Sequence, residues 1–309
     1  MAKKITVIGA GHVGAAVARC CLNKDLGRVV LLDVATNVAM GKALDIRQAG
    51  VLEGHTYNVV GTGDYKDTAG SDLVVITAGM VRKPGMSRED LLKTNISIVS
   101  MVAKAAIAES PDAMFIVVSN PVDVLCKTAL DVTGLPPHRL IGLSGMLDGA
   151  RLRSFIAAKV GVPAKTVTGI TLGEHGDSMV PLPRLSTIGG VPASALLSAE
   201  DMAEVAEKTT KGGAEYVALM GFSAWFAPGI AVATMAEAIL KDSHAVINCS
   251  AYLNGEYGTK DLFMCVPAQI GAEGVEKILE FALTTEEKAA LEKSIASITK
   301  NLENAANLA

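Results

Sequence analysis

The sequence predicts an α/β fold in which a doubly wound parallel sheet is followed by an α+β domain. Up to about residue 145, apolar runs of strand length alternate with helical patterns. The first run leads into a glycine-rich turn at residues 9–14, and the alternation stops after Met146. The chain has 309 residues, which suits two domains of ~150 residues each. We therefore expect one domain at 1–146 and a second at 147–309.

Six candidate strands and four candidate helices make up the first domain. The strands are expected at residues 5–8, 29–32, 58–60, 73–77, 114–118 and 140–142, and the helices at 12–22, 39–49, 90–109 and 122–132. Strands that alternate with helices over short links are parallel and joined by right-handed crossovers. Six of them fit the order 3-2-1-4-5-6, with ligand at the carboxyl ends of the first and fourth strands.

The second domain is expected to mix helices with a few strands. The expected segments are a helix at 148–160, a segment at 166–171, a Gly/Pro-rich region up to residue 192, long helices, apolar stretches at 245–252 and 263–270, and a last helix at 285–302. Residues 216–236 carry no charge and are long enough to cross a bilayer. Because glycine and proline interrupt this segment, we expect a buried helix with a break at residues 227–229.

The glycine-rich turn reads G-x-G-x-x-G and stands between a predicted strand and a predicted helix. Gly9 allows the tight turn, Gly11 lets the backbone approach a pyrophosphate, and Gly14 lets the helix pack closely on the strand. The amide groups at the start of the helix favour phosphate. Asp33 ends the second strand, where its carboxylate can accept hydrogen bonds from the ribose and repel a 2′-phosphate. The pattern predicts a Rossmann domain that binds NAD rather than NADP.

The composition narrows the class of protein further. Hydrophobic residues make up 50% of the chain and aromatic residues only 4%, so aliphatic side chains must fill a large core. A net charge of −4 argues against nucleic-acid and membrane-surface partners. The five cysteines show no C-x-x-C spacing and no secretory signal is evident, which predicts reduced thiols in a cytoplasmic protein.

Polar residues that could carry chemistry follow the predicted strands or lie on the helix after them. His175 stands between glycines, and none of the five histidines has metal-ligand spacing, so no metal site is expected. Asp148 and Arg151 are three residues apart and share a helix face. Taken alone, this spacing is equally typical of a local ion pair at the start of a helix. Three cations, Arg82, Lys83 and Arg88, follow the fourth strand, and Ser119-Asn120-Pro121 follows the fifth.

The motifs of the chain, taken in order, resemble those of the lactate/malate dehydrogenase superfamily over essentially its whole length. The matching elements are GAGHVG, Asp33, TAGMVRKPGMSR, Asn95, VSNPVD, MLDGARLR and GEHGDS. The resemblance implies a Rossmann domain followed by an α+β catalytic domain. It also implies hydride transfer between NAD and a 2-hydroxy or 2-oxo acid, in a homodimer or homotetramer.

The resemblance also implies a role for individual residues. His175 corresponds to the catalytic acid/base, and Asp148 to the carboxylate that holds its other ring nitrogen. Arg151 matches the arginine that grips the C1 carboxylate of the substrate. Arg88 matches the arginine that polarises the reacting carbonyl, and Asn120 a donor to the substrate oxygen. The implied cofactor contacts are Gly9, Gly11, His12, Val13, Gly14, Asp33, Asn95, Val118, Ser119 and Asn120.

Arg82 bears on the choice of substrate. In the superfamily this position faces the end of the substrate remote from C1, and malate-type members have arginine there, whereas lactate-type members have a neutral residue. An unpaired guanidinium against the methyl group of pyruvate costs several kcal/mol, whereas the second carboxylate of oxaloacetate pairs with it. The resemblance therefore implies a malate/oxaloacetate substrate. The alternatives are an L-lactate or other 2-hydroxy-acid dehydrogenase, and a non-catalytic NAD-binding sensor.

Overall fold

The computed structural model describes residues 2–80 and 88–308, which form one nine-stranded sheet and two small two-stranded sheets. The first six strands are β1 (Lys4–Ile8), β2 (Arg28–Leu32), β3 (Val59–Thr62), β4 (Leu73–Ile76), β5 (Met114–Val117) and β6 (Leu140–Gly142). They are parallel and follow the order β3-β2-β1-β4-β5-β6. This confirms the predicted doubly wound order, with its switch point between β1 and β4.

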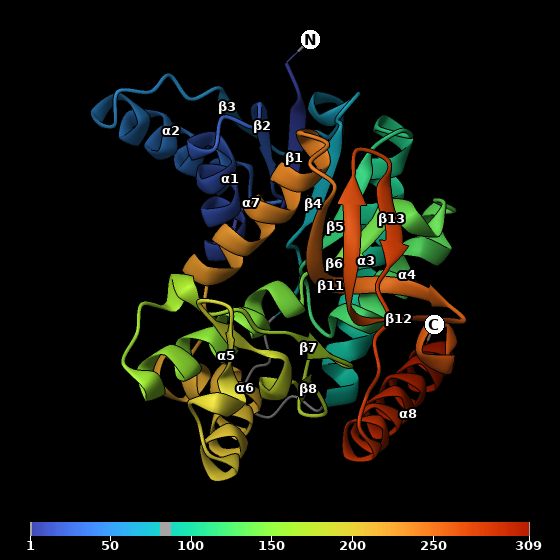
Figure 1. Ribbon diagram of the computed structural model, residues 1–309. Helices are drawn as coiled ribbons and strands as arrows, with labels where there is room; N and C mark the ends of the chain where they lie inside the picture. The colour runs from blue at the N-terminus through green and yellow to red at the C-terminus, as the bar shows by residue number, and fades with distance from the viewer. Residues whose placement is uncertain (1, 81–87, 309) are drawn as a thin grey trace.

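Helices cover both faces of the parallel sheet (Figure 1). They include α1 (His12–Asn23), α2 (Thr36–Leu52), α3 (Arg88–Glu109), α4 (Val122–Thr133) and, from the second half of the chain, α7 (Phe226–Leu240). Alternate strand residues supply the two cores, since side chains point to opposite faces. Val75 and Ile116 pack with α1, α2 and α7, whereas Val74 and Phe115 pack with α3 and α4.

The long strands of the second half of the chain extend this sheet, while its short strands form the two small sheets. Its main elements are α5 (Gly145–Val160), α6 (Ala199–Met220), β11 (Ala245–Asn254), β12 (Lys260–Gly271), β13 (Gly274–Ile278) and α8 (Thr285–Leu308). β11 meets β6 in antiparallel fashion where Ser250 pairs with Gly142, and β12 and β13 follow outward. A side chain at Gly142 would meet Cys126 Sγ at 2.6 Å, so glycine lets the strands and α4 close together.

The remaining elements are short. They are β7 (Thr171–Leu172), β8 (Val180–Pro181), β9 (Thr187–Ile188), β10 (Val191–Pro192) and the 3₁₀ turns η1 (Tyr65–Thr68), η2 (Pro137–Arg139), η3 (Ala164–Thr166), η4 (Pro183–Leu185), η5 (Ala193–Ala195) and η6 (Glu256–Gly258). The apolar stretches at 245–252 and 263–270 become the long hairpin of β11 and β12. The expected boundary at residue 146 falls in the first turn of α5 and stays a prediction.

The predicted helix break at residues 227–229 is wrong. α6 ends at Met220, where Gly221 adopts a left-handed conformation with φ of 77°, and α7 starts at Phe226. Pro228 therefore lies in the first turn of α7, where a backbone N–H has no partner within the helix. The glycines and the proline of the segment correctly indicated that the helix is interrupted. They did not show that the interruption occurs at Gly221 instead of Pro228.

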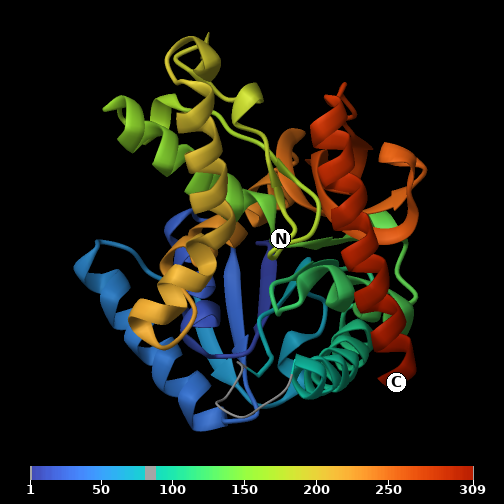
Figure 2. The same cartoon turned by 90° about the horizontal axis from the view of Figure 1, so that it is seen from below.

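Among the described helices, residues 89–109 are long and apolar enough to cross a membrane on length and composition alone. In the structure this helix, α3, packs against α4 and α8, and its residues Val99, Val102 and Ala103 belong to the core. Figure 2 shows α8 beside this pair of helices. A helix that contributes one face to a protein core meets the same criteria, and 39% of this window is buried. All five cysteines are free and four are buried, as expected.

Candidate active site

The glycine-rich turn forms a cradle at the carboxyl ends of β1 and β4. Gly9 has φ of 104°, and a Cβ there would lie 2.7 Å from Thr77 Oγ1. A Cβ on Gly14 would lie 1.8 Å from the carbonyl oxygen of Gly9. A Cβ on Gly11, in contrast, would have no heavy atom of the described residues within 4 Å. Two glycines thus allow close packing and the third leaves space beside the helix N-terminus, which fits a dinucleotide pyrophosphate.

Asp33 ties the end of β2 to the glycine-rich turn. Its carboxylate accepts hydrogen bonds from the backbone N–H of Ala10 at 2.6 Å and of Ala35 at 2.8 Å. The side chain is only partly buried. The negative charge therefore stands at the edge of the cradle, the position that the sequence predicts for a ribose contact.

Two polar side chains join the loops that follow β4 and β5. Asn95 Oδ1 accepts from the Met80 N–H at 2.7 Å, while Nδ2 donates to the carbonyl of Asn120 at 2.8 Å. Ser119 Oγ donates to the carbonyl of Ala78 at 2.6 Å. Asn95 is 2% exposed, so these bonds within the protein occupy its amide. Its amide therefore joins the loops that follow β4 and β5. Direct contact with the cofactor stays a prediction, as it does for Val118.

His12 is the first residue of α1 and lies against the turn between α6 and α7. Its ring centroid is 4.8 Å from that of Trp225 and 6.1 Å from that of Phe222. Val13, the next residue, is partly buried against the core. The aromatic contact joins the glycine-rich turn to a segment more than 200 residues away, and no local sequence signal indicated it.

Two predicted substrate residues cannot be placed as side chains. Arg82, like Lys83, belongs to residues 81–87, which lie outside the described residues. Arg88 is the first residue of α3, and only its backbone is described. Their roles stay predictions.

The structure brings together three of the four remaining predicted catalytic and substrate residues, and the fourth, Asn120, lies on the loop after β5. His175 lies on the loop between β7 and β8, and Asp148 and Arg151 lie on α5. His175 Nδ1 is 2.6 Å from Asp148 Oδ2, and Arg151 Nη1 donates to Asp148 Oδ1 at 2.9 Å. The exposed fraction of the side chain is 2% for Asp148, 13% for His175 and 21% for Arg151. Both the local ion pair and the predicted carboxylate–imidazole pair are therefore present.

The surroundings of His175 favour its protonated form. Burial acts to lower the pKa of the ring, but the charge of Asp148 and its hydrogen bond raise it, and Asp123 adds to this effect. Arg151 opposes the carboxylates. The net result is a pKa above the ordinary value of 6.5.

Helix α6 leaves room for the Arg151 side chain. A Cβ on Gly212 would lie 3.3 Å from its Cδ, and a Cβ on Gly213 would lie 3.5 Å from its Nη1 and Nη2. A side chain at position 212 would therefore press on the stem of Arg151, whereas the distance at position 213 is that of an ordinary contact. Gly212 thus leaves room for the predicted carboxylate-binding arginine.

The sequence did not assign two further carboxylates beside His175. Asp123 Oδ2 accepts from the backbone N–H of His175 at 2.9 Å, and burial raises the pKa of Asp123 to about 6 despite hydrogen bonds from Ser250 and His175. Glu174 accepts from Ser297 Oγ at 3.0 Å and Asn301 Nδ2 at 2.9 Å, both on α8. Asp123 is the last residue of the VSNPVD motif, so its acidic side chain was evident from the sequence. Its hydrogen bond to the backbone of His175 was not, because that contact depends on the tertiary fold.

One group of described side chains has the geometry to hold a metal ion. Asp242, His244 and Glu276 have ligand atoms within 4.8 Å of one another, and all three residues are exposed. They lie on the turn before β11 and on β13, apart from the loop of His175. The expectation of no metal site stays a prediction.

A dinucleotide cradle together with a carboxylate-held histidine defines a class of enzyme, the nucleotide-dependent oxidoreductases. The family model "lactate/malate dehydrogenase, NAD binding domain" matches residues 3–142, and the model of the alpha/beta C-terminal domain matches residues 145–309. The chain belongs to the lactate/malate dehydrogenase family and is an NAD-dependent oxidoreductase. This confirms the predicted fold class, enzyme class and cofactor.

Relatives of both substrate types share this fold. A malate dehydrogenase of Desulforudis audaxviator is 49% identical over 297 residues, 96% of each chain. The solved malate dehydrogenase of Salinibacter ruber has a TM-score of 0.95 and 44% identity, covering 99% of this chain and 98% of its own. The lactate dehydrogenase of Cryptosporidium parvum, solved with lactic acid and nicotinamide adenine dinucleotide, has a TM-score of 0.96 and 39% identity over 99% of each chain.

Replacing Asp33 by Asn should narrow the preference for NADH over NADPH by about 10-fold or more. The substitution removes the charge that repels a 2′-phosphate but keeps an oxygen that can accept from Ala10. A like-charge contact near a protein surface is worth a few kcal/mol. The measurement is kcat/KM for both cofactors in both proteins. An unchanged ratio would show that Asp33 does not select the cofactor.

Proposed function

We propose that the protein is an NAD-dependent malate dehydrogenase, which interconverts (S)-malate and oxaloacetate and acts in the tricarboxylic acid cycle. The bond between Asp148 and His175 is the observation that carries the chemistry, because it orients a histidine for proton transfer. The substrate is supported by Arg82 and by relatives at 47–49% identity that are named malate dehydrogenase. Some structural neighbours are lactate dehydrogenases, so lactate is the alternative substrate.

His175 exchanges the proton of the substrate hydroxyl. Asp148 occupies Nδ1, which leaves Nε2 as the nitrogen for proton transfer. During malate oxidation the neutral ring accepts the hydroxyl proton, and Asp148 stabilises the imidazolium that results. During oxaloacetate reduction the imidazolium returns the proton. When bound, NAD supplies the hydride acceptor and NADH the hydride donor.

Three arginines and Asn120 bind and orient the substrate. Arg151 uses one nitrogen to hold Asp148 and has further N–H groups for the C1 carboxylate. Arg88 polarises the reacting carbonyl, and Asn120 donates a hydrogen bond to the same oxygen. Arg82 pairs with the second carboxylate, which pyruvate and lactate lack.

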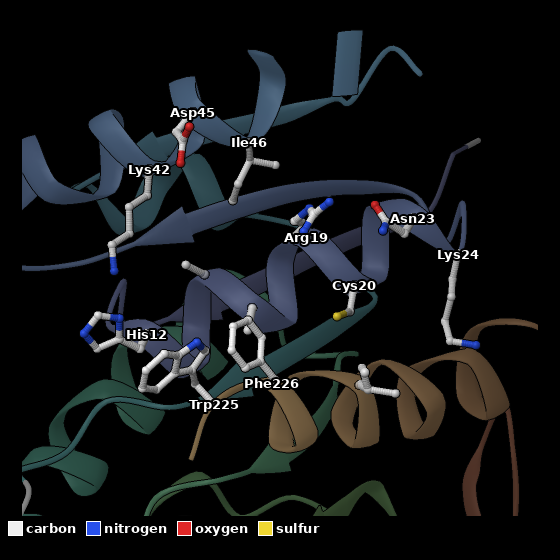
Figure 3. Close-up of a pocket in the computed structure, with 13 residues that line it drawn as sticks. His12, Arg19, Cys20, Asn23, Lys24, Lys42, Asp45, Ile46, Trp225 and Phe226 are labelled. Carbon is white, nitrogen blue, oxygen red and sulfur yellow. The ribbon is translucent and has the colours of Figure 1, made fainter. Parts of the chain in front are cut away.

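We further propose that two copies of the chain associate through an apolar hollow over α1, between α2 and α7. Figure 3 shows Trp225 and Phe226 beside α1, with Ile46 opposite. The hollow has a volume of about 540 Å³, and Phe226 and Ile230 on its rim are 70% and 57% exposed. Large exposed apolar side chains gathered around one hollow are typical of an interface. We expect a second copy of the chain to cover this hollow, as it would in a homodimer or homotetramer.

The cytoplasm is the proposed location. Five free cysteines, four of them buried, fit a reducing compartment.

Replacing His175 by Asn should reduce kcat by ~10²–10⁴-fold, the size of a general acid–base contribution, with NADH affinity nearly unchanged. In the unmodified enzyme, oxaloacetate reduction needs the imidazolium and is lost as pH rises through the raised pKa of His175. Malate oxidation needs the neutral ring and rises over the same interval. Rate profiles in both directions, with NADH affinity from fluorescence titration, test this. Parallel pH trends would contradict the acid–base role.

The unmodified enzyme should prefer oxaloacetate to pyruvate by ~10³-fold or more in kcat/KM, which corresponds to ~4 kcal/mol at the transition state. Arg82→Gln should lower activity on oxaloacetate steeply and raise activity on pyruvate, because pyruvate no longer leaves a guanidinium unpaired. Arg151→Gln is the matched control and should harm both substrates, since both carry the C1 carboxylate. An unchanged ratio in Arg82→Gln would favour a different substrate determinant.

Replacing Phe226 by Asp should shift the oligomer toward the monomer, because a buried interface does not accommodate an unpaired carboxylate. Val191, which is 45% exposed on β10, provides the control Val191→Asp. Light scattering after size-exclusion chromatography measures the mass of each variant. An unmodified protein that is monomeric, or a Phe226→Asp variant of unchanged mass, would contradict this interface.

A further inference from the structure

The carboxylate of Asp123 is buried beneath His175, and no lysine or arginine of the described residues pairs with it. Asp123 is 3% exposed and lies in the first turn of α4. Its oxygens accept from the His175 backbone N–H at 2.9 Å and from Ser250 Oγ at 2.6 Å. A buried carboxylate in this situation is costly.

The hydrogen bonds alone do not require a carboxylate. An asparagine would offer the same kind of oxygen to the His175 N–H and a polar group to Ser250, without the cost of burying a charge. What only aspartate supplies is a negative charge directly below the loop that carries the catalytic imidazole. The N-terminus of α4 partly offsets the cost, because a helix start stabilises negative charge.

We propose that Asp123 is a positioning residue whose negative charge supports the protonated state of His175, in addition to fixing the backbone of its loop. Asp148 acts on the ring at Nδ1, whereas Asp123 acts from the backbone side. The histidine is therefore held between two carboxylates from different helices, α5 and α4. This inference rests on the proposed acid–base role of His175.

The titratable groups that interact with Asp123 or with His175 come from several elements of the fold. They are Glu174 and His175 on the β7–β8 loop, Asp148 and Arg151 on α5, Cys126 on α4 and Cys265 on β12. Burial raises the pKa of the Cys126 and Cys265 thiols, so both are neutral near pH 7. Arg151 acts against protonation of His175, and the carboxylates act for it.

The test is Asp123→Asn, which keeps the oxygen at the His175 N–H and removes the charge. Loss of a nearby opposite charge lowers a histidine pKa by about one unit, at the low end of the usual range. In the pH–rate profiles, the fall of oxaloacetate reduction and the rise of malate oxidation should therefore both move about one pH unit lower. We expect reduction at pH 8 to fall about tenfold, with the KM for NADH unchanged. Asp67→Asn, an exposed change of equal charge on η1, should leave both profiles in place.

A second comparison separates positioning from folding. If Asp123 acts through His175, Asp123→Asn should have no further effect on the residual turnover of His175→Asn, and thermal unfolding of the two single variants should remain cooperative. Unmoved pH–rate profiles, or an equal loss of turnover in both backgrounds, would overturn the inference. Full turnover in His175→Asn would instead overturn the proposed acid–base role itself.

Discussion

The buried bond between Asp148 and His175 is the interaction on which the rest of the site depends. Asp148 is almost fully buried, and removing one partner of a buried ion pair typically costs several kcal/mol. The fold satisfies its two oxygens from two directions, with Arg151 on the same helix and His175 on a distant loop. The same bond leaves one ring nitrogen for chemistry, so the requirement for stability and the requirement for catalysis coincide.

The loop of His175 is held on several sides by elements that are far apart in the sequence. Gly173 exchanges backbone hydrogen bonds with Cys265 of β12, at 3.1 and 2.9 Å. The N–H of Glu174 donates to Ser294 of α8 at 2.7 Å. Because β12 belongs to the same nine-stranded sheet as β1, the histidine loop and the nucleotide cradle are joined by one continuous framework. Such a framework suits a reaction that needs the acid–base group and the cofactor in fixed positions.

Local patterns in the sequence were enough for the order of the parallel strands and for the pairing of Asp148 with Arg151, whereas the meeting of His175 with this pair was implied only by the resemblance to the family. Spacing places Asp148 and Arg151 on one helix face, and the motif identifies Gly9, whose φ is positive, and Gly14, which has no room for a Cβ. The joining of β11 to β6 was not predictable, because antiparallel pairing of Ser250 with Gly142 leaves no local signal. The partners of Asp123 and Asn95 were missed for the same reason, since both depend on contacts across the fold.

The most direct test of the central claim is to titrate the His175 ring itself by nitrogen-15 NMR in the protein labelled at histidine, with His175→Asn used to assign the signal. Both carboxylates raise the pKa of His175, and the bond to Asp148 requires a proton on Nδ1 in the neutral ring. We expect a pKa clearly above 6.5 and the Nδ1–H tautomer at high pH. A pKa at or below 6.5, or a neutral ring protonated on Nε2, would contradict the account.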